Sequence, residues 1–411
     1  MRIRYGATQD GRPVKKAIVY TRDEHSIRLD AVDKDAVYIV ERLRANGYET
    51  YIVGGAVRDL ILGRHPKDFD IVSAASPARI KRIFRNSRII GRRFRLVHVY
   101  FGPKIFEVST FRSLKDGPTS NTYGSIEEDV LRRDFSLNAL FYDPLKEIVV
   151  DYVGGMKDIR EKRVRPIIPL SVIFKDDPVR MIRAVKYAAA TSFKLPWRLV
   201  WKLRRQAPLL SGISPSRLTE EILKIVHSPY AARIIENLEF FGLYGYLQPE
   251  ASALLRRDTS FRSRYIKGFA DLALKAETVR AHGESMAVLI RDFLEETIDW
   301  EGGIIENYKT AFLEARRFVL PMNPPRAELD HAVRLIFGEH GLTVKKSRFL
   351  LANARQADPR LLEETPETAV PVPEGEPKRR RRRGRRRGKA AGAGRETAAL
   401  PSSSPVEDPG E

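Results

Sequence analysis

The 411-residue chain contains no cysteine, which excludes disulfide bonds, thiolate zinc sites and thiol catalysis and is consistent with a reducing compartment. The sequence also lacks any run of the roughly 20 apolar residues that a membrane-spanning helix needs. Its first residues, MRIRYGATQDGRPVKK, lack the apolar centre of a signal peptide. We therefore expect a cytoplasmic protein that makes no membrane contact.

Acidic residues are scarce relative to basic ones. The chain has 53 Asp and Glu against 73 Lys and Arg, which gives a net charge of +20 and a pI near 10.0. Ten of the positive charges fall in one short segment, residues 378–389, and the rest of the chain is still basic. An excess of this size is expected in a protein that binds a polyanion, of which a nucleic acid is the first candidate.

Four regions differ in composition and pattern. Residues 1–30 are polar and without periodicity, which predicts a flexible N-terminal arm. Short alternating strand and helix patterns over residues 31–155 predict a small mixed-sheet domain. Residues 156–362 contain helical patterns and no convincing strand, and residues 363–411 have so little to bury that they predict a disordered basic tail. The expected fold class is therefore α+β.

The densest chemical motif is YIVGGAVRDLILGRHPKDFDIV, residues 51–72. A predicted strand ends at Gly54 and Gly55 and a helix begins, so that bare backbone N–H groups can approach a phosphate, with Arg58 one turn into the helix as a further contact. Asp68 and Asp70 flank Phe69 on the next predicted strand, where alternation places both carboxylates on one face.

The paired acids predict a metal site. Two adjacent carboxylates repel each other, and oxygen-rich sites of this kind suit Mg²⁺ shared with substrate phosphates. Glu107, in KIFEVSTF, falls on the polar face of a neighbouring strand and could complete a set that bridges two metal ions. An isolated pair of acids is also common on solvated loops, so the metal hypothesis depends on the combination with the glycines and Glu107.

Two further motifs could recognise a nucleotide. In LRRDFSLNALFY, Asp134 and Asn138 are four residues apart and could share a helical face that binds a ribose or a base, with Arg133 beside them. In DDPVRMIRAVKYAAA, Asp177 and Arg180 could together read the edge of a base. A capped, salt-bridged helix is the alternative interpretation of either motif.

In this order and spacing, the motifs resemble those of the class II branch of the polymerase-β nucleotidyltransferase superfamily, which contains CCA-adding enzymes and bacterial poly(A) polymerases. The resemblance covers residues 23–250 or so. The pattern GGxVRDxLLGxxxxDxD matches with Ile61 in place of one leucine, RRDFTxNA matches with Ser136 for threonine, and EDxxRxxR matches with Asp176 for glutamate. The last match adds Arg183 to the residues expected to select the nucleotide.

The resemblance implies a polymerase-β-like catalytic head over residues 31–155, a helical neck over residues 156–245 for nucleotide selection and RNA binding, and a helical body over residues 246–362. It also implies two Mg²⁺ ions, with Mn²⁺ as an alternative, and ATP as the substrate. Asp68 and Asp70 are the expected metal ligands, and Glu107 is the expected third catalytic acid.

The segment IIGRRFRLVHVYFG, residues 89–102, is similar to the basic strand of bacterial poly(A) polymerases. Arg92, Arg93 and Arg95 in it are expected to contact RNA phosphates, or else to be solvated neighbours of the strand. His98 alternates with apolar residues and is interpreted as a packing residue. The arginine-rich tail is expected to grip RNA or to bind RNA-decay or RNA-chaperone proteins.

The function that the resemblance favours is a template-independent poly(A) polymerase, which transfers AMP from ATP to RNA 3′ ends and releases pyrophosphate. A CCA-adding tRNA nucleotidyltransferase is the first alternative. The second is a catalytically inactive RNA-binding protein, against which the intact set of acids argues.

Overall fold

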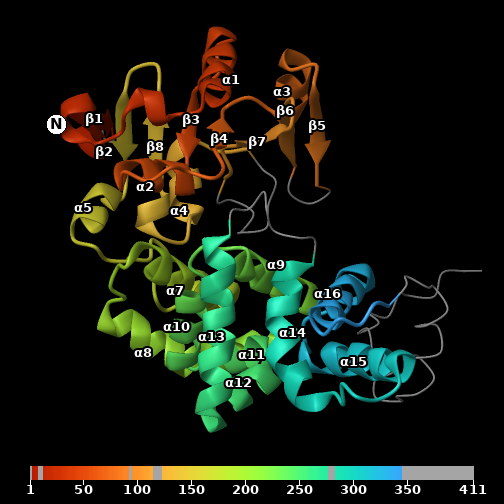
Figure 1. Cartoon of the computed structure of the whole chain (residues 1–411). Coiled ribbons are helices and arrows are strands. Elements are labelled where there is room, and N and C mark those ends of the chain that lie inside the picture. The colour runs from red at the N-terminus through yellow and green to blue at the C-terminus, as the bar shows by residue number, and fades with distance from the viewer. Residues whose placement is uncertain (1, 8–12, 92–94, 114–122, 276–282, 345–411) are drawn as a thin grey trace, which may run out of the picture. The chain divides into compact units, whose positions relative to one another are not determined.

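The computed structural model describes residues 2–7, 13–91, 95–113, 123–275 and 283–344. Among these residues, one mixed sheet of nine strands is followed by helices (Figure 1). Its order is β1-β2-β9-β8-β3-β4-β7-β6-β5. The strands are β1 Arg2–Ala7, β2 Pro13–Tyr20, β3 Thr50–Val53, β4 Asp70–Ser73, β5 Ser87–Ile90, β6 Leu96–Phe101, β7 Lys104–Thr110, β8 Leu140–Asp143 and β9 Ile148–Asp151.

The strand pairs differ in direction at the centre of the sheet. β4 and β7 are parallel, and the other neighbouring strands pair in antiparallel fashion. A parallel pair needs a crossover connection, and here the chain supplies it through α3 (Pro77–Ile83), β5 and β6. Asp70, the first residue of β4, therefore lies beside Glu107 in the middle of β7, on two neighbouring central strands.

Helices cover both faces of the sheet. α1 Lys34–Ala45, α2 Gly55–Ile61 and α3 pack their apolar residues into the large core cluster, together with Ile52 and Ile71 of the central strands. α4 Ile126–Arg132 covers the opposite face, where Val53 and Val72 belong to a separate small cluster. Alternate residues of each central strand thus face different cores, as period-2 patterning requires.

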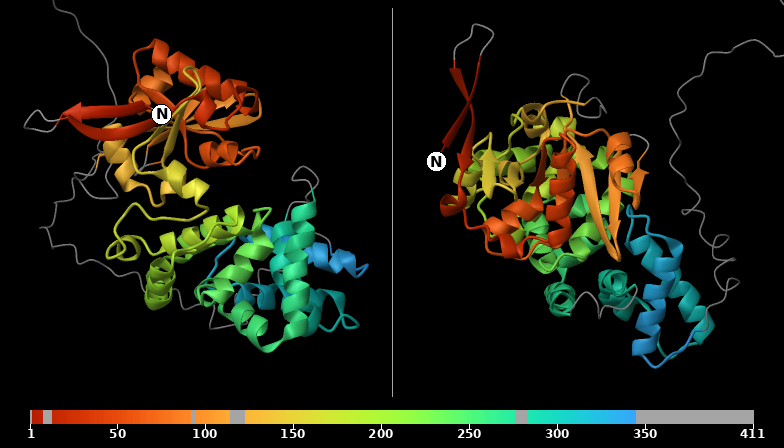
Figure 2. Two further views of the ribbon diagram at one scale, coloured as in Figure 1. Left: turned by 90° about the vertical axis from the view of Figure 1, so that its left-hand side faces the viewer. Right: turned by 90° about the horizontal axis from the view of Figure 1, so that it is seen from above.

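The N-terminal residues correct one expectation. The sequence predicts a flexible arm over residues 1–30, but β1 and β2 pair with each other and β2 joins the sheet through β9. Two short 3₁₀ turns follow, at Arg22–Glu24 and Leu29–Ala31. Figure 2 shows the β1–β2 ribbon projecting from the sheet. β1 alternates basic and apolar residues and β2 ends in an apolar run, so a short strand signal was present in the sequence and was not used.

Beyond β9, every regular element within the described residues is helical, which confirms the predicted α+β class. These elements are α5 Gly155–Arg160, α6 Ile173–Asp176, α7 Val179–Thr191, α8 Trp197–Gln206, η4 Ala207–Gly212, α9 Pro215–Val226, α10 Ala231–Phe240, α11 Tyr244–Leu247, α12 Pro249–Arg257, α13 Thr259–Leu274, α14 Glu284–Thr297, α15 Ile304–Phe318 and α16 Arg326–Glu339. None of the helices in the described ranges is both long and apolar enough to cross a membrane. The predicted tail, residues 363–411, lies outside the described residues.

Candidate active site

The turn between β3 and α2 places a glycine directly against an acidic side chain. Gly54 has φ +75° and ψ −137°, a conformation that side-chain-bearing residues rarely adopt. Its neighbour Val53 pairs with Asp70 across the antiparallel β3–β4 ladder. A Cβ atom on Gly54 would lie 3.4 Å from Oδ2 of Asp70. The absence of a side chain therefore leaves the space beside this carboxylate open.

Glu107 approaches the same point from the parallel neighbour of β4. The register pairs Ile71 with Val108, so that the preceding residues, Asp70 and Glu107, are the next pair along the ladder. Ile71 and Val108 are buried in the large core, whereas Glu107 is exposed on the other face. This is the alternation that the sequence predicted for the two acids.

The pKa of Asp70 is raised from 3.8 to about 6. Burial is the largest cause, the negative charge of Glu107 is the next, and Asp68 adds to it, while the positive charge of Arg133 opposes the shift. The carboxylate is nevertheless accessible to water, because it lies on the wall of a cleft. A carboxylate that has acidic neighbours and is reachable from solvent is well placed to bind a cation.

Asp68 lies two residues before the start of β4 and lines a different cavity. That cavity, of about 750 Å³, is also lined by Arg64, His65 and Lys186, whereas Asp70 and Glu107 line the main cleft. The two aspartates remain neighbours, since the charge of Asp68 raises the pKa of Asp70. The expected pairing on one strand is thus modified, because β4 begins only at Asp70.

The acidic side chains of the site are chemically suited to bind a divalent cation. Asp70 and Glu107 offer carboxylate oxygens on neighbouring strands, and carboxylate oxygens are the ligands that Mg²⁺ prefers. Within the described part of the chain, no three Asp, Glu, His or Cys side chains are already gathered at the spacing of a metal site. Glu107 instead lies beside His98, with Oε1 and Nε2 3.5 Å apart.

The contact between His98 and Glu107 was not expected, because the sequence pattern indicates a packing role for His98. The two residues are direct partners in the β6–β7 register. The Gly102–Pro103 turn between the two strands could have predicted this pairing, because a tight hairpin fixes the register on both sides of the turn. His98 also makes an edge-to-face contact with Tyr100.

The Arg133–Asn138 segment differs from the predicted helical turn. α4 ends at Arg132, and a 3₁₀ turn at Ser136–Asn138 follows a bend through Asp134. The helix ends at this point because Arg133 has an extended backbone conformation. Asp134 and Asn138 still line one small cavity of about 290 Å³, together with Gly54, Gly55 and Asp70.

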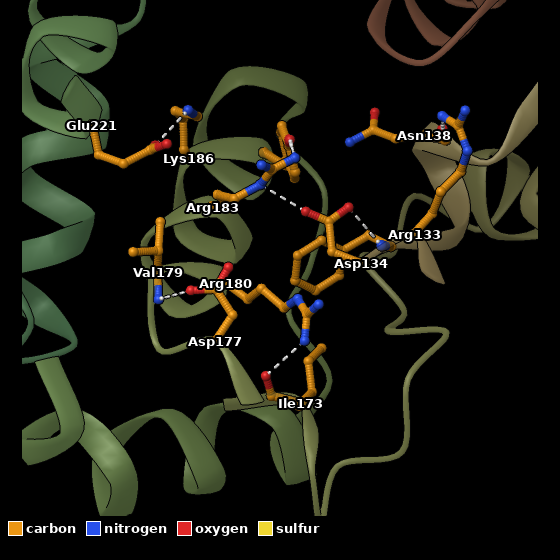
Figure 3. Close-up of polar contacts among 12 residues, drawn as sticks. Arg133, Asp134, Asn138, Ile173, Asp177, Val179, Arg180, Arg183, Lys186 and Glu221 are labelled. Atoms are coloured by element: carbon orange, nitrogen blue, oxygen red, sulfur yellow. Dashed lines mark hydrogen bonds and ion pairs between the residues drawn. The ribbon is translucent and has the colours of Figure 1, made fainter. Parts of the chain in front are cut away.

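Arg183 and Arg133 are held in place around this cavity. Nε of Arg183 lies 2.7 Å from Oδ2 of Asp134, although the two atoms are not aligned as a hydrogen bond (Figure 3). Arg133 donates to Asp129 at 3.0 and 3.1 Å and to the backbone oxygen of Asn138 at 3.2 Å. Both guanidinium groups thus have fixed positions at the cavity wall.

Asp177 and Arg180 line the same cavity, but their side chains do not pair with each other. Arg180 donates to the carbonyl of Ile173 at 3.2 Å (Figure 3). It also pairs with Asp176, whereas Asp177 accepts from Arg217 of α9 at 3.0 Å. The alternative interpretation of this motif, a salt bridge between Asp177 and Arg180 within one helix, is therefore wrong. Asp176, which stands where the family has glutamate, instead anchors the arginine.

Arg58 has a different environment from the predicted phosphate contact. Its Nε and Nη2 atoms donate to Asp59 at 2.8 Å each, and Nη1 donates to Oδ1 of Asn138 at 2.9 Å. The Arg58 side chain is only 12% exposed and lies 5.7 Å from the ring centre of Tyr187. Burial raises the pKa of the Tyr187 hydroxyl to about 12. The motif predicted neither the contact of Arg58 with Asn138 nor its contact with Tyr187, and both arise from the tertiary fold.

The main cleft, of about 970 Å³, joins these elements. It is lined by both acidic and basic side chains of the sheet domain and of α6 and α7, including Asp70, Glu107, Arg133, Asp177, Arg180 and Arg183. Arg132 also lines it, and so does Asp129, which was not predicted as a site residue. Arg95 is exposed immediately before β6, and Arg92 and Arg93 lie outside the described residues.

Comparison with known families identifies two matching regions. Residues 50–165 match the family described as "Poly A polymerase head domain". Residues 193–255 match the one described as "Probable RNA and SrmB- binding site of polymerase A". The first region contains β3 to β9 and the acids discussed above, and the second contains α8 to α11.

Individual relatives come from two groups of enzymes. The chain is 38% identical over 282 residues to poly(A) polymerase I of Escherichia coli O6:H1, which covers 65% of this chain and 60% of the relative. It is 37% identical over 220 residues to the CCA-adding enzyme of Geobacillus stearothermophilus, covering 52% and 54%. The chain thus spans little more than half the length of these curated relatives.

A solved structure also matches. The CCA-adding enzyme of Bacillus stearothermophilus in complex with CTP aligns with a TM-score of 0.52 and 28% identity, over 74% of this chain and 82% of that chain. The similarity therefore extends through the sheet domain into the helical part.

Proposed function

Because the chain belongs to the class II nucleotidyltransferase family of poly(A) polymerases and CCA-adding enzymes, we propose that it transfers AMP from ATP to the 3′ hydroxyl of RNA and releases pyrophosphate. The observation that carries this proposal is the position of the Asp70 carboxylate, beside the bare backbone of Gly54 and next to Glu107 on the adjoining strand. A triphosphate can reach the glycine turn and the acids together.

Asp68, Asp70 and Glu107 are the residues that would hold divalent ions. Such ions, when bound, would activate the attacking hydroxyl and offset the charge of the leaving pyrophosphate. The raised pKa of Asp70 supports this assignment. Burial and two neighbouring acids disfavour the ionised carboxylate, and a bound cation would offset this cost. The chain itself contributes the positions of these carboxylates on β4, β7 and the preceding loop, which is the main protein contribution in phosphoryl transfer.

The nucleotide is assigned to the small cavity beside Gly54 and Gly55. Arg133 and Arg183 supply positive charge there, and Asp134 and Asn138 supply ribose or base contacts. Asp177 and Arg180, each held by its own partner, present an acceptor and a donor at the same wall. Their fixed orientation would let them read the base without a template. Arg58 contributes by holding Asn138, and a direct phosphate contact stays a prediction.

CCA addition is the second candidate, because a CCA-adding enzyme complex with CTP shares the fold and a CCA-adding relative is 37% identical. Poly(A) addition is favoured by the longer match to poly(A) polymerase I and by the basic segment at residues 89–102. An RNA-binding protein without activity is disfavoured by the retained acids.

Primer extension with each nucleoside triphosphate separately tests the proposal. We expect ATP alone to extend an unstructured RNA into a long homopolymer. Addition that stops after three residues on a tRNA lacking its end, and that requires CTP, would establish CCA addition instead. The matched control is Asp70→Ala, which should lose incorporation while RNA affinity is retained. Turnover by Asp70→Ala would rule out the metal site.

A further inference from the structure

Two of the three tryptophans in the chain are exposed on one helix. Trp197 and Trp201 of α8 have relative exposures of 72% and 53%. The third, Trp300, stacks on His340 with ring centres 3.8 Å apart and an angle of 7° between the planes. Single exposed rings are common on protein surfaces, whereas two neighbouring exposed indoles on one helix form a patch for which an occupant is expected.

α8 has a buried and an aromatic side. Leu199 and Leu203 are buried in the core. Trp197 and Trp201 are four residues apart and therefore neighbours along the outer side of the helix. The core contact is satisfied by the leucines, so the indoles contribute little to it. Their removal should leave the fold intact.

Cations surround both indoles. Arg198 lies 5.3 Å from the ring centre of Trp197, and Arg205 and Lys202 lie 5.2 and 6.0 Å from that of Trp201. α8 contains no acidic residue. This alternation of flat aromatic faces with positive charges matches a single-stranded nucleic acid, which alternates stackable bases with phosphates.

A third exposed ring extends the surface. Phe240, at the end of α10, is 70% exposed, and Arg204 of α8 lies 5.5 Å from its ring centre. Because Trp197 and Arg204 are seven residues apart, the rings span about 10 Å or more along α8. That length accommodates two or three stacked or extended nucleotides.

We propose that Trp197, Trp201 and Phe240, with the cations beside them, form a stacking platform for unpaired bases of the RNA substrate. This proposal rests on the proposed function in one respect, that the substrate is RNA. The family match over residues 193–255 is described in terms of both RNA and a protein. The cations over the rings and the absence of acids on α8 favour RNA as the occupant of this surface.

Equilibrium binding of a 20-nucleotide single-stranded oligo(A), without ATP or metal, tests the platform. We expect Trp197→Ala, Trp201→Ala and Phe240→Ala each to weaken binding roughly fivefold or more, and Trp→Phe at either indole to restore most of the loss. Tyr38→Ala is the control, because it removes an exposed ring from α1 in the sheet domain. Unchanged affinity in all three variants would overturn the proposal.

Salt dependence separates stacking from charge. The alanine variants should leave the slope of log affinity against log salt unchanged, because that slope counts phosphate contacts. Arg198→Gln with Lys202→Gln should reduce the slope by about 1.4. A reduced slope in the tryptophan variants, with Trp→Phe failing to rescue, would show that the indoles only position cations and would contradict stacking.

Intrinsic fluorescence gives an independent readout. Oligo(A) should quench the emission of the wild-type protein, and Trp197→Phe with Trp201→Phe, which leaves Trp300 as the one tryptophan, should abolish the change. Quenching that persists in this double variant would count against the platform. Because these measurements omit ATP, failure of the proposed function would appear separately, as an absence of primer extension by the wild-type protein.

Discussion

Arg58 donates a hydrogen bond from Nη1 to Oδ1 of Asn138 at 2.9 Å and so joins two motifs that are 80 residues apart in the chain. Its Nε and Nη2 atoms donate to the neighbouring Asp59, which fixes the plane of the guanidinium. The family motifs that contain Arg58 and Asn138 are therefore physically coupled. Arg58 acts in this arrangement as a positioning residue for the amide at the nucleotide cavity.

We predict that Arg58→Lys lowers kcat/KM for ATP about tenfold, because an ammonium cannot reproduce the planar contacts of the guanidinium and the loss of a charged hydrogen bond costs about 1.5 to 3 kcal/mol. Asn138→Ala should reduce kcat/KM by a similar factor, and the double variant should lose much less than the product. The control Arg28→Lys alters an exposed ion pair with Asp30. Fully independent effects would contradict the coupling.

Gly54→Ala should abolish most activity, and Gly47→Ala should not. Both glycines have positive φ, +75° and +84°, so each substitution should cost about 1 kcal/mol of folding free energy. A Cβ at Gly47 meets no atom within 4 Å, whereas one at Gly54 fills the space beside Asp70. Thermal unfolding and primer extension, measured on both variants, separate strain from site blockage. Equal activities would show that the open turn is unimportant.

Asp70→Asn should stabilise the metal-free protein at neutral pH. The folded-state pKa of Asp70, about 6, lies above its ordinary value of 3.8, so the wild type loses stability as pH rises through this window and the variant does not. Since the carboxylate is open to water in the cleft, we expect the difference to reach only about 1 kcal/mol. Unfolding curves in EDTA between pH 4 and pH 8 measure it.

Mg²⁺ should reverse this order. Added to the wild type, the ion should raise the melting temperature by binding the folded state, and it should have a much smaller effect on Asp70→Asn. Equal shifts for the two proteins would place the ion elsewhere.

Removal of residues 363–411 should weaken RNA binding most strongly at low salt. The deleted segment carries ten Lys and Arg between residues 378 and 389, and the salt slope for single-stranded RNA should fall by about 0.7 for every phosphate that the tail neutralises. A slope identical to that of the full chain would exclude a role of the tail in gripping RNA. The tail would then be free for the predicted protein partners.

The sequence by itself determined the features that depend on neighbours along the chain. The strand, glycine turn and helix around Gly54, the side of β7 on which Glu107 lies, and the change from mixed sheet to helices all follow from short-range periodicity and turn chemistry. The register that unites His98 with Glu107 was also within reach, because the Gly102–Pro103 turn sets it.

Only the tertiary structure decided which charged groups meet. Arg180 pairs with Asp176, Asp177 with Arg217, and Arg58 with Asn138, and none of these choices follows from spacing alone. Likewise, β1 and β2 become strands because β9 offers them an edge. Such partners are fixed by the packing of segments far apart in sequence, where several candidates of the right charge exist and geometry selects one.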